Sequence, residues 1–307
     1  MSSLGDIIHT FPAVTDLRRA LPDAELDWIV EEGYVPLARL HPGVTRIVPI
    51  ALRRWRRQLL SPRTWREAAA FRRSLRERSY EAILDTQGLL KSGLAAWLAQ
   101  GPVYGFGRGT ARETLATRFY DVTYEFAAAE HKVERYRAVA ARALGYVPGA
   151  LDYGIGALPR PDGIPFSPYC VLLHSTARAA KLWREAGWVE VGRHLAARGY
   201  VCVLPWGDDK ERVRAERLAA AIPRAWVPVR MRLADACGLI AHAKLVIGVD
   251  TGLMHLAAAL RVPVLGIFCD SEPLDAHPLG AGRIAFRGGV GKPPSAGAVI
   301  GALSELA

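Results

Sequence analysis

The sequence predicts an α/β fold built from two Rossmann-like domains, each with a parallel sheet. Strand-like runs alternate with helical runs along both halves of the chain, which is the pattern of parallel sheets covered by helices. A stretch rich in proline and glycine (147–168) interrupts the alternation and predicts a linker. Half of the 307 residues are hydrophobic, which is enough for two cores. We therefore expect an N-terminal domain (1–150), a C-terminal domain (165–307) and a ligand cleft between them.

The N-terminal half begins with a helix where a doubly wound fold has its first strand. Apolar residues recur at helical spacing between Ile7 and Leu17, and Ser3 and Asp6 stand at the start of this helix. Either the fold begins with a helix or the chain starts several residues too late. We expect a misplaced start codon, which intact-mass analysis of the native protein tests. The strands expected next are 25–31, 44–51, 81–87 and 103–106, and the helices 34–41, 89–100, 111–120 and 131–146.

The C-terminal half repeats the alternation. Its strand-like runs are rich in branched apolar residues and are bounded by glycine, proline or charged residues. The expected strands are 169–175, 200–207, 225–229, 245–250 and 263–269, and the expected helices are 184–198, 208–221, 233–243, 253–260 and 295–306.

The turn from the strand-like run 245–250 into the next helix predicts an anion site. Asp250 ends the strand, and Thr251 and Gly252 form the turn. The first turn of a helix carries unpaired N–H groups and a dipole that favours anions, and Gly252 lets a phosphate approach the backbone. His255 lies one turn into the helix, on a different face from its apolar residues. The alternative is that Asp250 or Thr251 only caps the helix and His255 is an ordinary polar residue.

Residues able to bind a ligand follow several strands of the C-terminal half, and parallel strands bring them to one edge of the sheet. They are Ser175, Thr176, Lys181, Glu211 and Met231. Hydroxyls, a helix start and a lysine suit a diphosphate, whereas carboxylates suit ribose or sugar hydroxyls. Each residue also has a structural explanation when taken singly, because hydroxyls form turns, acidic residues favour the first turn of a helix, and lysines are usually solvated. Their convergence favours a binding site.

The segment 51–80 is rich in arginine and follows the end of a predicted strand. Four arginines with tryptophans nearby suit a multiply anionic ligand held by bidentate contacts. They are Arg53, Arg54, Arg56 and Arg57. The alternative is a solvated helix face, which fits the arginines from 72 to 78 better. Asp6, at the start of the first helix, is the candidate catalytic base, and the alternative for Asp6 is a helix cap.

The composition narrows the classes of partner. A formal net charge of +10 is compatible with nucleic acid, an anionic membrane surface or a phosphorylated ligand, but no nucleic-acid recognition module accompanies the arginines. The four cysteines lie in apolar runs without a CxxC pair, so we expect buried thiols rather than disulfides or a metal site. No apolar run is long enough to span a bilayer and no signal peptide is recognisable, so a cytoplasmic location is expected.

The motifs occur in the order seen in the lipopolysaccharide heptosyltransferases of glycosyltransferase family 9, which the chain resembles over nearly its whole length. They are SSLGDIIHTFPAVTDLR, LDWIVEEG, IALRRWRR, LDTQGLLKS, TARE, EHKVERYR, LHSTARAAKLW, LPWG and VDTGLMHL. The DTQGLLKS segment is similar to heptosyltransferase I rather than heptosyltransferase II. The resemblance implies a GT-B fold, in which two Rossmann-like domains face each other across a cleft.

The resemblance also implies an inverting, metal-independent glycosyltransferase that needs no cofactor. The donor would be ADP-L-glycero-D-manno-heptose, and the acceptor would be the Kdo sugar of Kdo2-lipid A. The enzyme would be peripheral on the anionic cytoplasmic face of the inner membrane, and Asp6 would be the catalytic base. Donor binding would fall to Ser175, Thr176, Lys181, Glu211, Met231, Asp250, Thr251, Gly252 and His255, and acceptor binding to Arg53, Arg54, Arg56, Arg57 and Arg112.

The sequence departs from the family at a few positions. Ala177 stands where the family often has a second phosphate-binding threonine, which predicts weaker donor affinity. Three alternatives stay open: another family 9 transferase with a different nucleotide-sugar or a later core acceptor, a Rossmann oxidoreductase, and an arginine-rich nucleic-acid-binding protein. No GxGxxG follows a predicted strand, which argues against the oxidoreductase.

Overall fold

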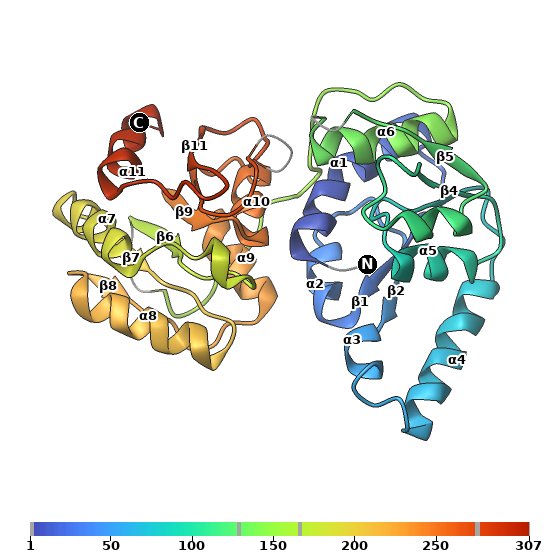
Figure 1. Cartoon of the computed structure of the whole chain (residues 1–307), viewed down its shortest axis with the longest axis horizontal. Coiled ribbons are helices and arrows are strands. Elements are labelled where there is room, and N and C mark those ends of the chain that lie inside the picture. Colours follow the sequence, from blue (N-terminus) through green and yellow to red (C-terminus); the bar gives the residue numbers. More distant parts are fainter. Residues whose placement is uncertain (1–2, 128–129, 165–167, 274–276, 307) are drawn as a thin grey trace. The chain divides into compact units, whose positions relative to one another are not determined.

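The computed structural model describes residues 3–127, 130–164, 168–273 and 277–306. The chain divides into two compact units, Met1–Gly154 and Ile155–Ala307. Each unit combines strands with helices (Figure 1), and every pair of named strands in the described residues is parallel. The predicted α/β class with parallel sheets is confirmed.

The N-terminal unit alternates strands and helices after an opening helix. Its strands are β1 (Asp27–Glu31), β2 (Arg46–Ile50), β3 (Ile83–Leu84), β4 (Val103–Phe106) and β5 (Val122–Tyr124). Its α-helices are α1 (Leu4–Ala20), α2 (Val35–Ala38), α3 (Leu52–Trp55), α4 (Pro62–Arg76), α5 (Leu90–Trp97) and α6 (Lys132–Leu144), and two 3-10 helices, η1 (Glu32–Tyr34) and η2 (Thr114–Phe119), complete it.

The opening helix α1 begins at a serine cap and is buried along most of its length. The Ser3 hydroxyl accepts a hydrogen bond from the Asp6 backbone N–H at 3.3 Å, which satisfies one of the donors left open at a helix start. Ser3 is therefore the cap, and the alternative that Asp6 caps this helix is wrong. Most residues from Asp6 to Leu17 are buried, and α1 packs along α6.

The strands of the N-terminal unit form two separate sheets. One contains β1 and β2, and the other contains β3, β4 and β5. Residues of β1 and β3 line a cavity of about 480 Å³, whose walls also include residues of α1, α5 and α6. Ile83 and Leu84 of β3 stay half-buried as a result. Among the described residues no strand precedes α1, and β1 and β3 each lack a partner strand on their other edge.

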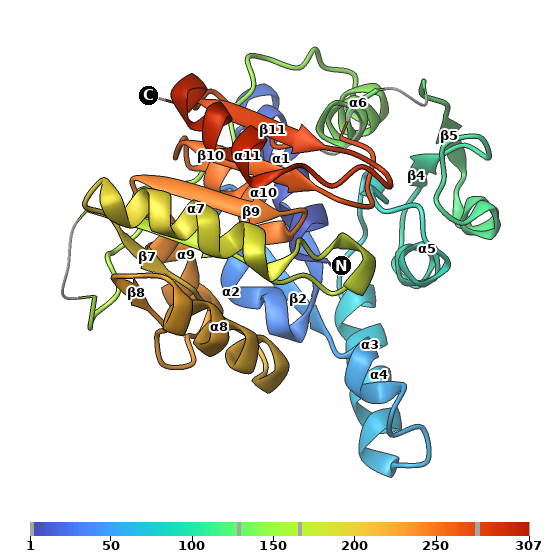
Figure 2. The same ribbon diagram turned by 60° about the vertical axis from the view of Figure 1, so that its left-hand side comes forward.

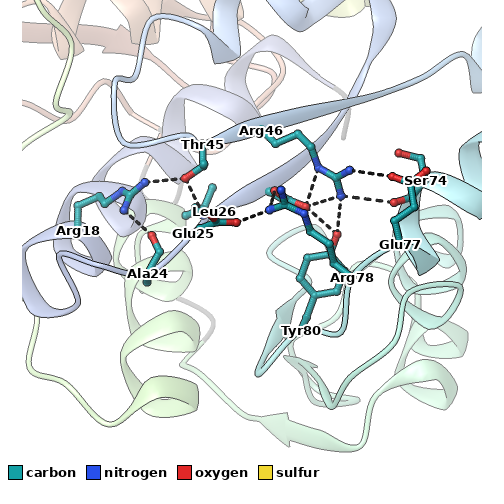
Figure 3. A network of polar contacts seen from close by, with 11 residues as sticks. Arg18, Ala24, Glu25, Leu26, Thr45, Arg46, Ser74, Glu77, Arg78 and Tyr80 are labelled. Atoms are coloured by element: carbon teal, nitrogen blue, oxygen red, sulfur yellow. Dashed lines mark hydrogen bonds and ion pairs between the residues drawn. The ribbon is translucent and has the colours of Figure 1, made fainter.

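Side-chain contacts bridge the two sheets at the amino ends of β1 and β3, as Figure 3 shows around Arg46 and Tyr80. The Tyr80 hydroxyl donates to Asp27 at 2.7 Å. Arg46 donates from Nε to the same carboxylate at 2.9 Å and from a terminal nitrogen to the Tyr80 oxygen at 3.0 Å. Beyond the carboxyl end of β3, the Thr10 and Thr86 hydroxyls lie 3.3 Å apart, which links α1 to the segment after β3. This contact lies beside the candidate site.

The C-terminal unit has one six-stranded sheet with the order β11-β10-β9-β6-β7-β8. Its strands are β6 (Tyr169–Leu173), β7 (Val201–Val203), β8 (Ala225–Trp226), β9 (Leu245–Val249), β10 (Val264–Phe268) and β11 (Ile284–Gly288). Its helices are α7 (Glu185–Ala197), α8 (Asp209–Ala221), α9 (Leu233–Ala241), α10 (Gly252–Ala259) and α11 (Ala296–Ala302), with 3-10 turns η3 (Ala179–Lys181) and η4 (Leu303–Leu306).

Helices cover both faces of this sheet. Side chains from α7, α8 and α11 share one core cluster with residues of β6, β7, β9 and β10, and Figure 2 shows α7 and α11 on the same face. The helices α9 and α10 pack against each other on the other side (Figure 1). Because β6 and β9 are central and buried along nearly their whole length, the residues that follow them start from a rigid edge.

Several predicted elements differ from the structure. The predicted strand 81–87 is reduced to β3, because it pairs with β4 on one side only and borders the cavity on the other. The predicted helix 111–120 is the 3-10 helix η2, and the strands β5 and β11 had not been predicted. All four cysteines are free and buried, as the apolar runs around them predicted.

Candidate active site

In the C-terminal unit, the turn between β9 and α10 forms the centre of the candidate donor site. Thr251 occupies the cap position of α10 with extended backbone angles, but its side chain makes no capping hydrogen bond. The Asp250 carboxylate contacts Lys181 and His255. The side-chain contacts of Asp250 and Thr251 therefore do not support the alternative that either residue serves only as a cap.

Asp250 connects three predicted donor-binding residues. Its carboxylate forms a short ion pair with the Lys181 ammonium, and Nε2 of His255 lies 3.6 Å from its other oxygen. The Thr176 hydroxyl donates to the Asp250 backbone carbonyl at 3.1 Å. Burial alone would raise the pKa of Asp250, but the hydrogen bonds and charges of His255 and Lys181 outweigh it and hold this pKa well below its usual value. The carboxylate therefore stays ionised and keeps Lys181 at the start of α10.

The other predicted donor residues lie after neighbouring strands of the same sheet. Ser175 follows β6 and its hydroxyl lies 2.9 Å from Nδ1 of His174. Glu211 lies in the first turn of α8, beyond β7, and its carboxylate accepts a hydrogen bond from the Gly207 N–H at 2.7 Å. Asp208 caps that helix by accepting from the Glu211 N–H at 2.9 Å. Met231 follows β8 and is half-buried.

In the N-terminal unit, Asp6 is buried in the first turn of α1 with only 6% of its surface exposed. Its carboxylate accepts hydrogen bonds from Ser3 Oγ and Gln87 Nε2, both at 2.8 Å. Arg112 donates to it from two nitrogens, at 2.6 and 3.3 Å. Burial alone would raise the pKa of Asp6, but the charge and hydrogen bonds of Arg112, helped by Ser3 and Gln87, lower it below its usual value.

Three residues near Asp6 were not predicted from the sequence. Gln87 is aimed at Asp6 by a tight turn, in which Asp85 accepts from the Gln87 N–H at 2.8 Å and Gly88 adopts a φ of +64°. The Tyr136 hydroxyl lies 3.4 Å from the Asp6 carboxylate. Lys91 lies close enough to Asp6 for the two charges to interact. Burial lowers the pKa of Lys91, and the positive charge of Arg53 adds to this effect. Both Gln87 and Lys91 belong to the DTQGLLKS segment, so that motif was the available signal.

The predicted acceptor arginines differ in how far their charges are already paired. Arg54 forms ion pairs with Glu32 at 3.1 Å and Glu67 at 2.8 Å. The Arg53 guanidinium lies over the Tyr34 ring at 5.2 Å from its centre. Arg56 and Arg57 are exposed. Arg112 is the predicted acceptor residue that the structure joins to Asp6, whereas the charge of Arg54 is balanced within the fold.

Within the part of the chain that the structure describes, no group of three or more His, Cys, Asp or Glu side chains is placed to hold a metal ion. In the same part of the chain, no helix combines the length and the apolar character needed to cross a bilayer.

Comparisons with known proteins agree with these observations. The model of glycosyltransferase family 9 (heptosyltransferase) matches residues 68–298. Lipopolysaccharide heptosyltransferase 1 of Pseudomonas aeruginosa is 45% identical over 275 residues, which cover 89% of this chain and 78% of the relative. The same enzyme of Salmonella typhimurium is 40% identical over 277 residues, covering 89% and 87%.

Solved structures give the same result. The E. coli heptosyltransferase WaaC with ADP has a TM-score of 0.90 at 37% identity, and the match covers all of this chain and 98% of that one. The complex of that enzyme with ADP-2-deoxy-2-fluoro heptose has a TM-score of 0.86 with the same coverage. This likeness confirms the predicted GT-B class. The enzyme is a glycosyltransferase, so the alternative of a Rossmann oxidoreductase is wrong. The chain belongs to glycosyltransferase family 9, the heptosyltransferases.

Proposed function

We propose that this enzyme transfers L-glycero-D-manno-heptose from ADP-heptose to the Kdo sugar of Kdo2-lipid A, with inversion and without a metal ion. The two curated relatives described above carry the name lipopolysaccharide heptosyltransferase 1, and one related structure holds an ADP-heptose analogue. The observation that carries the proposal is the ion pair of Lys181 with Asp250 at the start of α10. It presents a cation and helix N–H groups together, which is what a leaving diphosphate requires.

The C-terminal unit is assigned to the donor. As the bond to the sugar breaks, the ADP gains negative charge, and Lys181 with the first turn of α10 would stabilise that charge. Thr176 and Ser175 would add hydrogen bonds to phosphate oxygens, whereas Glu211 suits the ribose hydroxyls and Met231 the adenine. Asp250 positions Lys181, and His255 completes the contacts of Asp250.

The N-terminal unit is assigned to the acceptor. The lowered pKa of Asp6 keeps its carboxylate ionised and therefore able to take the proton of the attacking hydroxyl. Arg112, which holds that carboxylate, would also attract the acid group of the Kdo sugar through its positive charge. Arg53, Arg56 and Arg57 are the further cations proposed for the acidic acceptor.

The second candidate within the family is a transferase that acts on a later core sugar. The E. coli enzymes named heptosyltransferase 2 and heptosyltransferase 3 are 26% and 24% identical to this chain, against 45% and 40% for the heptosyltransferase 1 of Pseudomonas aeruginosa and of Salmonella typhimurium. This difference favours the Kdo acceptor. Because that acceptor is a lipid, we also propose a peripheral location on the cytoplasmic face of the inner membrane.

The test is acceptor-dependent release of ADP from ADP-heptose, measured with Kdo2-lipid A and with a heptosylated acceptor. Replacing Asp6 with Asn should lower the rate by about a hundredfold to ten-thousandfold, which is the range for loss of a general base. Asp162→Asn, an exposed change in the linker, is the matched control and should keep full activity. Turnover of the heptosylated acceptor alone would contradict the proposed substrate, and full activity of Asp6→Asn would contradict the proposed base.

A further inference from the structure

The loop that joins α3 to α4 exposes apolar side chains to an unusual degree. We call residues 56–65 the α3–α4 tip. Within it Leu60 is 99% exposed, Trp65 64% and Leu59 56%. Figures 1 and 2 both place this tip at the end of the N-terminal unit opposite α6. Single exposed apolar residues are common on proteins, but three on one protruding turn mark a contact surface.

The tip is held in one conformation by its own hydrogen bonds. The Trp65 indole N–H donates to the Leu59 carbonyl at 2.8 Å, and the Thr64 hydroxyl donates to the Gln58 carbonyl at 2.8 Å. The Ser61 N–H bonds to the same Gln58 carbonyl at 3.1 Å. The indole has thus satisfied its polar group inside the tip and presents its apolar rings outward. Exposure of these side chains is therefore built into the fold.

The base of the tip is fixed as well. The Trp55 indole N–H donates to the Glu67 carboxylate at 2.8 Å, which ties the end of α3 to α4. Arg54 and Arg63 form ion pairs with the same carboxylate, both at 2.8 Å. Glu67 therefore joins both helices at the base of the tip.

Cations surround the apolar side chains. Arg56, Arg57, Arg63 and Arg66 are all exposed, and Glu67 is the acidic residue among positions 56–67. Leucine and tryptophan next to exposed arginines form the pattern that binds the interface of an anionic bilayer, because apolar side chains enter the acyl boundary while arginines contact phosphate groups. A protein partner would require a much broader face than one turn.

We propose that the α3–α4 tip inserts Leu59, Leu60 and Trp65 into the interface of an anionic phospholipid bilayer. Insertion would bring the neighbouring acceptor arginines to the level of the lipid headgroups. This inference rests on the proposed function only for the purpose of membrane binding, which would bring the enzyme to its lipid acceptor. The binding itself requires neither donor nor acceptor.

The first test measures binding of the whole protein to vesicles of phosphatidylethanolamine and phosphatidylglycerol, by sedimentation, with phosphatidylcholine vesicles in parallel. Leu60→Asp should weaken binding to the anionic vesicles by roughly tenfold or more, since it removes one inserted side chain and adds a repelled charge. Val147→Asp is the matched control, because Val147 is 90% exposed but lies in the linker, and it should bind as the unchanged protein does. Equal binding by Leu60→Asp and the unchanged protein would overturn the proposal.

A second measurement reports insertion directly. The four native cysteines are buried, so a Leu60→Cys variant can be labelled selectively with an environment-sensitive fluorophore, and Val147→Cys serves as its control. Anionic vesicles should shift the emission of the label at position 60 to shorter wavelength and leave the label at 147 unchanged. No shift at 60, or a shift that follows protein concentration without vesicles, would overturn lipid insertion; the latter result would point to a second copy of the chain as the occupant.

Turnover separates this proposal from the proposed function. Leu60→Asp should reduce ADP release with vesicle-embedded Kdo2-lipid A but keep full activity with a deacylated, water-soluble Kdo acceptor. Equal losses with both acceptors would place Leu60 in the acceptor site and overturn the membrane assignment. If no acceptor supports release by the unchanged protein, the proposed function fails, while the vesicle measurements still decide the role of the tip.

Discussion

Arg112 holds Asp6 through two hydrogen bonds, with one terminal nitrogen 2.6 Å from Oδ1 and the other 3.3 Å from Oδ2. The pair joins the predicted catalytic base to a predicted acceptor-binding residue that is 106 positions away in the sequence. Its electrostatic effect has a definite direction, since burial opposes ionisation of Asp6 and the Arg112 charge restores it. The arginine therefore determines the pH range in which Asp6 can act as a base.

Replacing Arg112 with Gln should move the acidic limb of the pH–rate profile to higher pH. The folded-state pKa of Asp6 is lowered in the native enzyme, so its carboxylate is ionised at and above the usual range and is protonated only as the pH falls further. Without the arginine, burial dominates and the pKa rises. The pH profile of kcat/KM for ADP release measures this shift. Arg112→Lys keeps a positive charge beside Asp6 and should therefore shift the acidic limb by less than Arg112→Gln does. An unmoved acidic limb in Arg112→Gln would show that another group controls it.

Replacing Lys181 with Met should weaken ADP binding by roughly ten- to a hundredfold, because a hydrogen bond to a charged group contributes about 1.5–3 kcal/mol. Calorimetric titration with ADP gives the change directly. Lys210→Met is the matched control, since Lys210 is an exposed lysine in α8 of the same unit. This variant should bind ADP as tightly as the unchanged protein does. Wild-type affinity in Lys181→Met would remove Lys181 from the diphosphate site.

The stability of the C-terminal unit should fall as the pH drops from about 6.5 towards 4. Burial, with a smaller effect from the Arg214 charge, lowers the pKa of His174 from 6.5 to about 4. An imidazole kept neutral in the fold contributes stability above its unfolded pKa and loses that contribution as the pH falls to its folded pKa, which amounts to roughly 3 kcal/mol at most.

Hydrogen exchange of the β6 amides in urea at two pH values measures this effect. His174→Gln should lose less stability on acidification than the unchanged protein, even if it is less stable at neutral pH. His242→Gln, a change at an exposed histidine of the same unit, is the control and should keep the original pH dependence. An identical slope in His174→Gln would assign the acid sensitivity to other groups.

Filling the cavity between β1 and β3 should stabilise the N-terminal unit. A short β-branched apolar segment with a two- or three-residue turn, fused before Met1, would run parallel to β1 and end beside Ser3, where α1 begins. Two or three buried aliphatic side chains contribute about 1.5–3 kcal/mol each, less the cost of ordering the segment. The midpoint temperature of thermal unfolding should therefore rise by several degrees.

The control for this fusion carries a central proline, which removes a ladder hydrogen bond and should cancel most of the gain. Hydrogen exchange should show new protection of amides in β1 and β3 with the apolar fusion alone. Equal melting temperatures for both fusions would mean that the cavity does not accept a strand.

Elements whose signals are local were predicted well from the sequence. The passage from β9 through Thr251 into α10 was recognised because a buried strand, a glycine turn and a 3.6-residue period are all read within 16 neighbouring residues. The helix α8 was found for the same reason. These signals also sufficed for the class of fold, since alternation of strands and helices admits few arrangements.

The tertiary structure decided what depends on distant neighbours. It shortened β3 because this strand pairs on one edge only, and it neutralised Arg54 with Glu32 and Glu67. It also brought Gln87 and Arg112 to Asp6 from segments far along the chain. Periodicity and composition determine which residues are buried, but the partners of a charge depend on which elements pack together. For this reason the sequence identified Asp6 and Lys181 as candidates, and only the fold showed how each is held in its charged form.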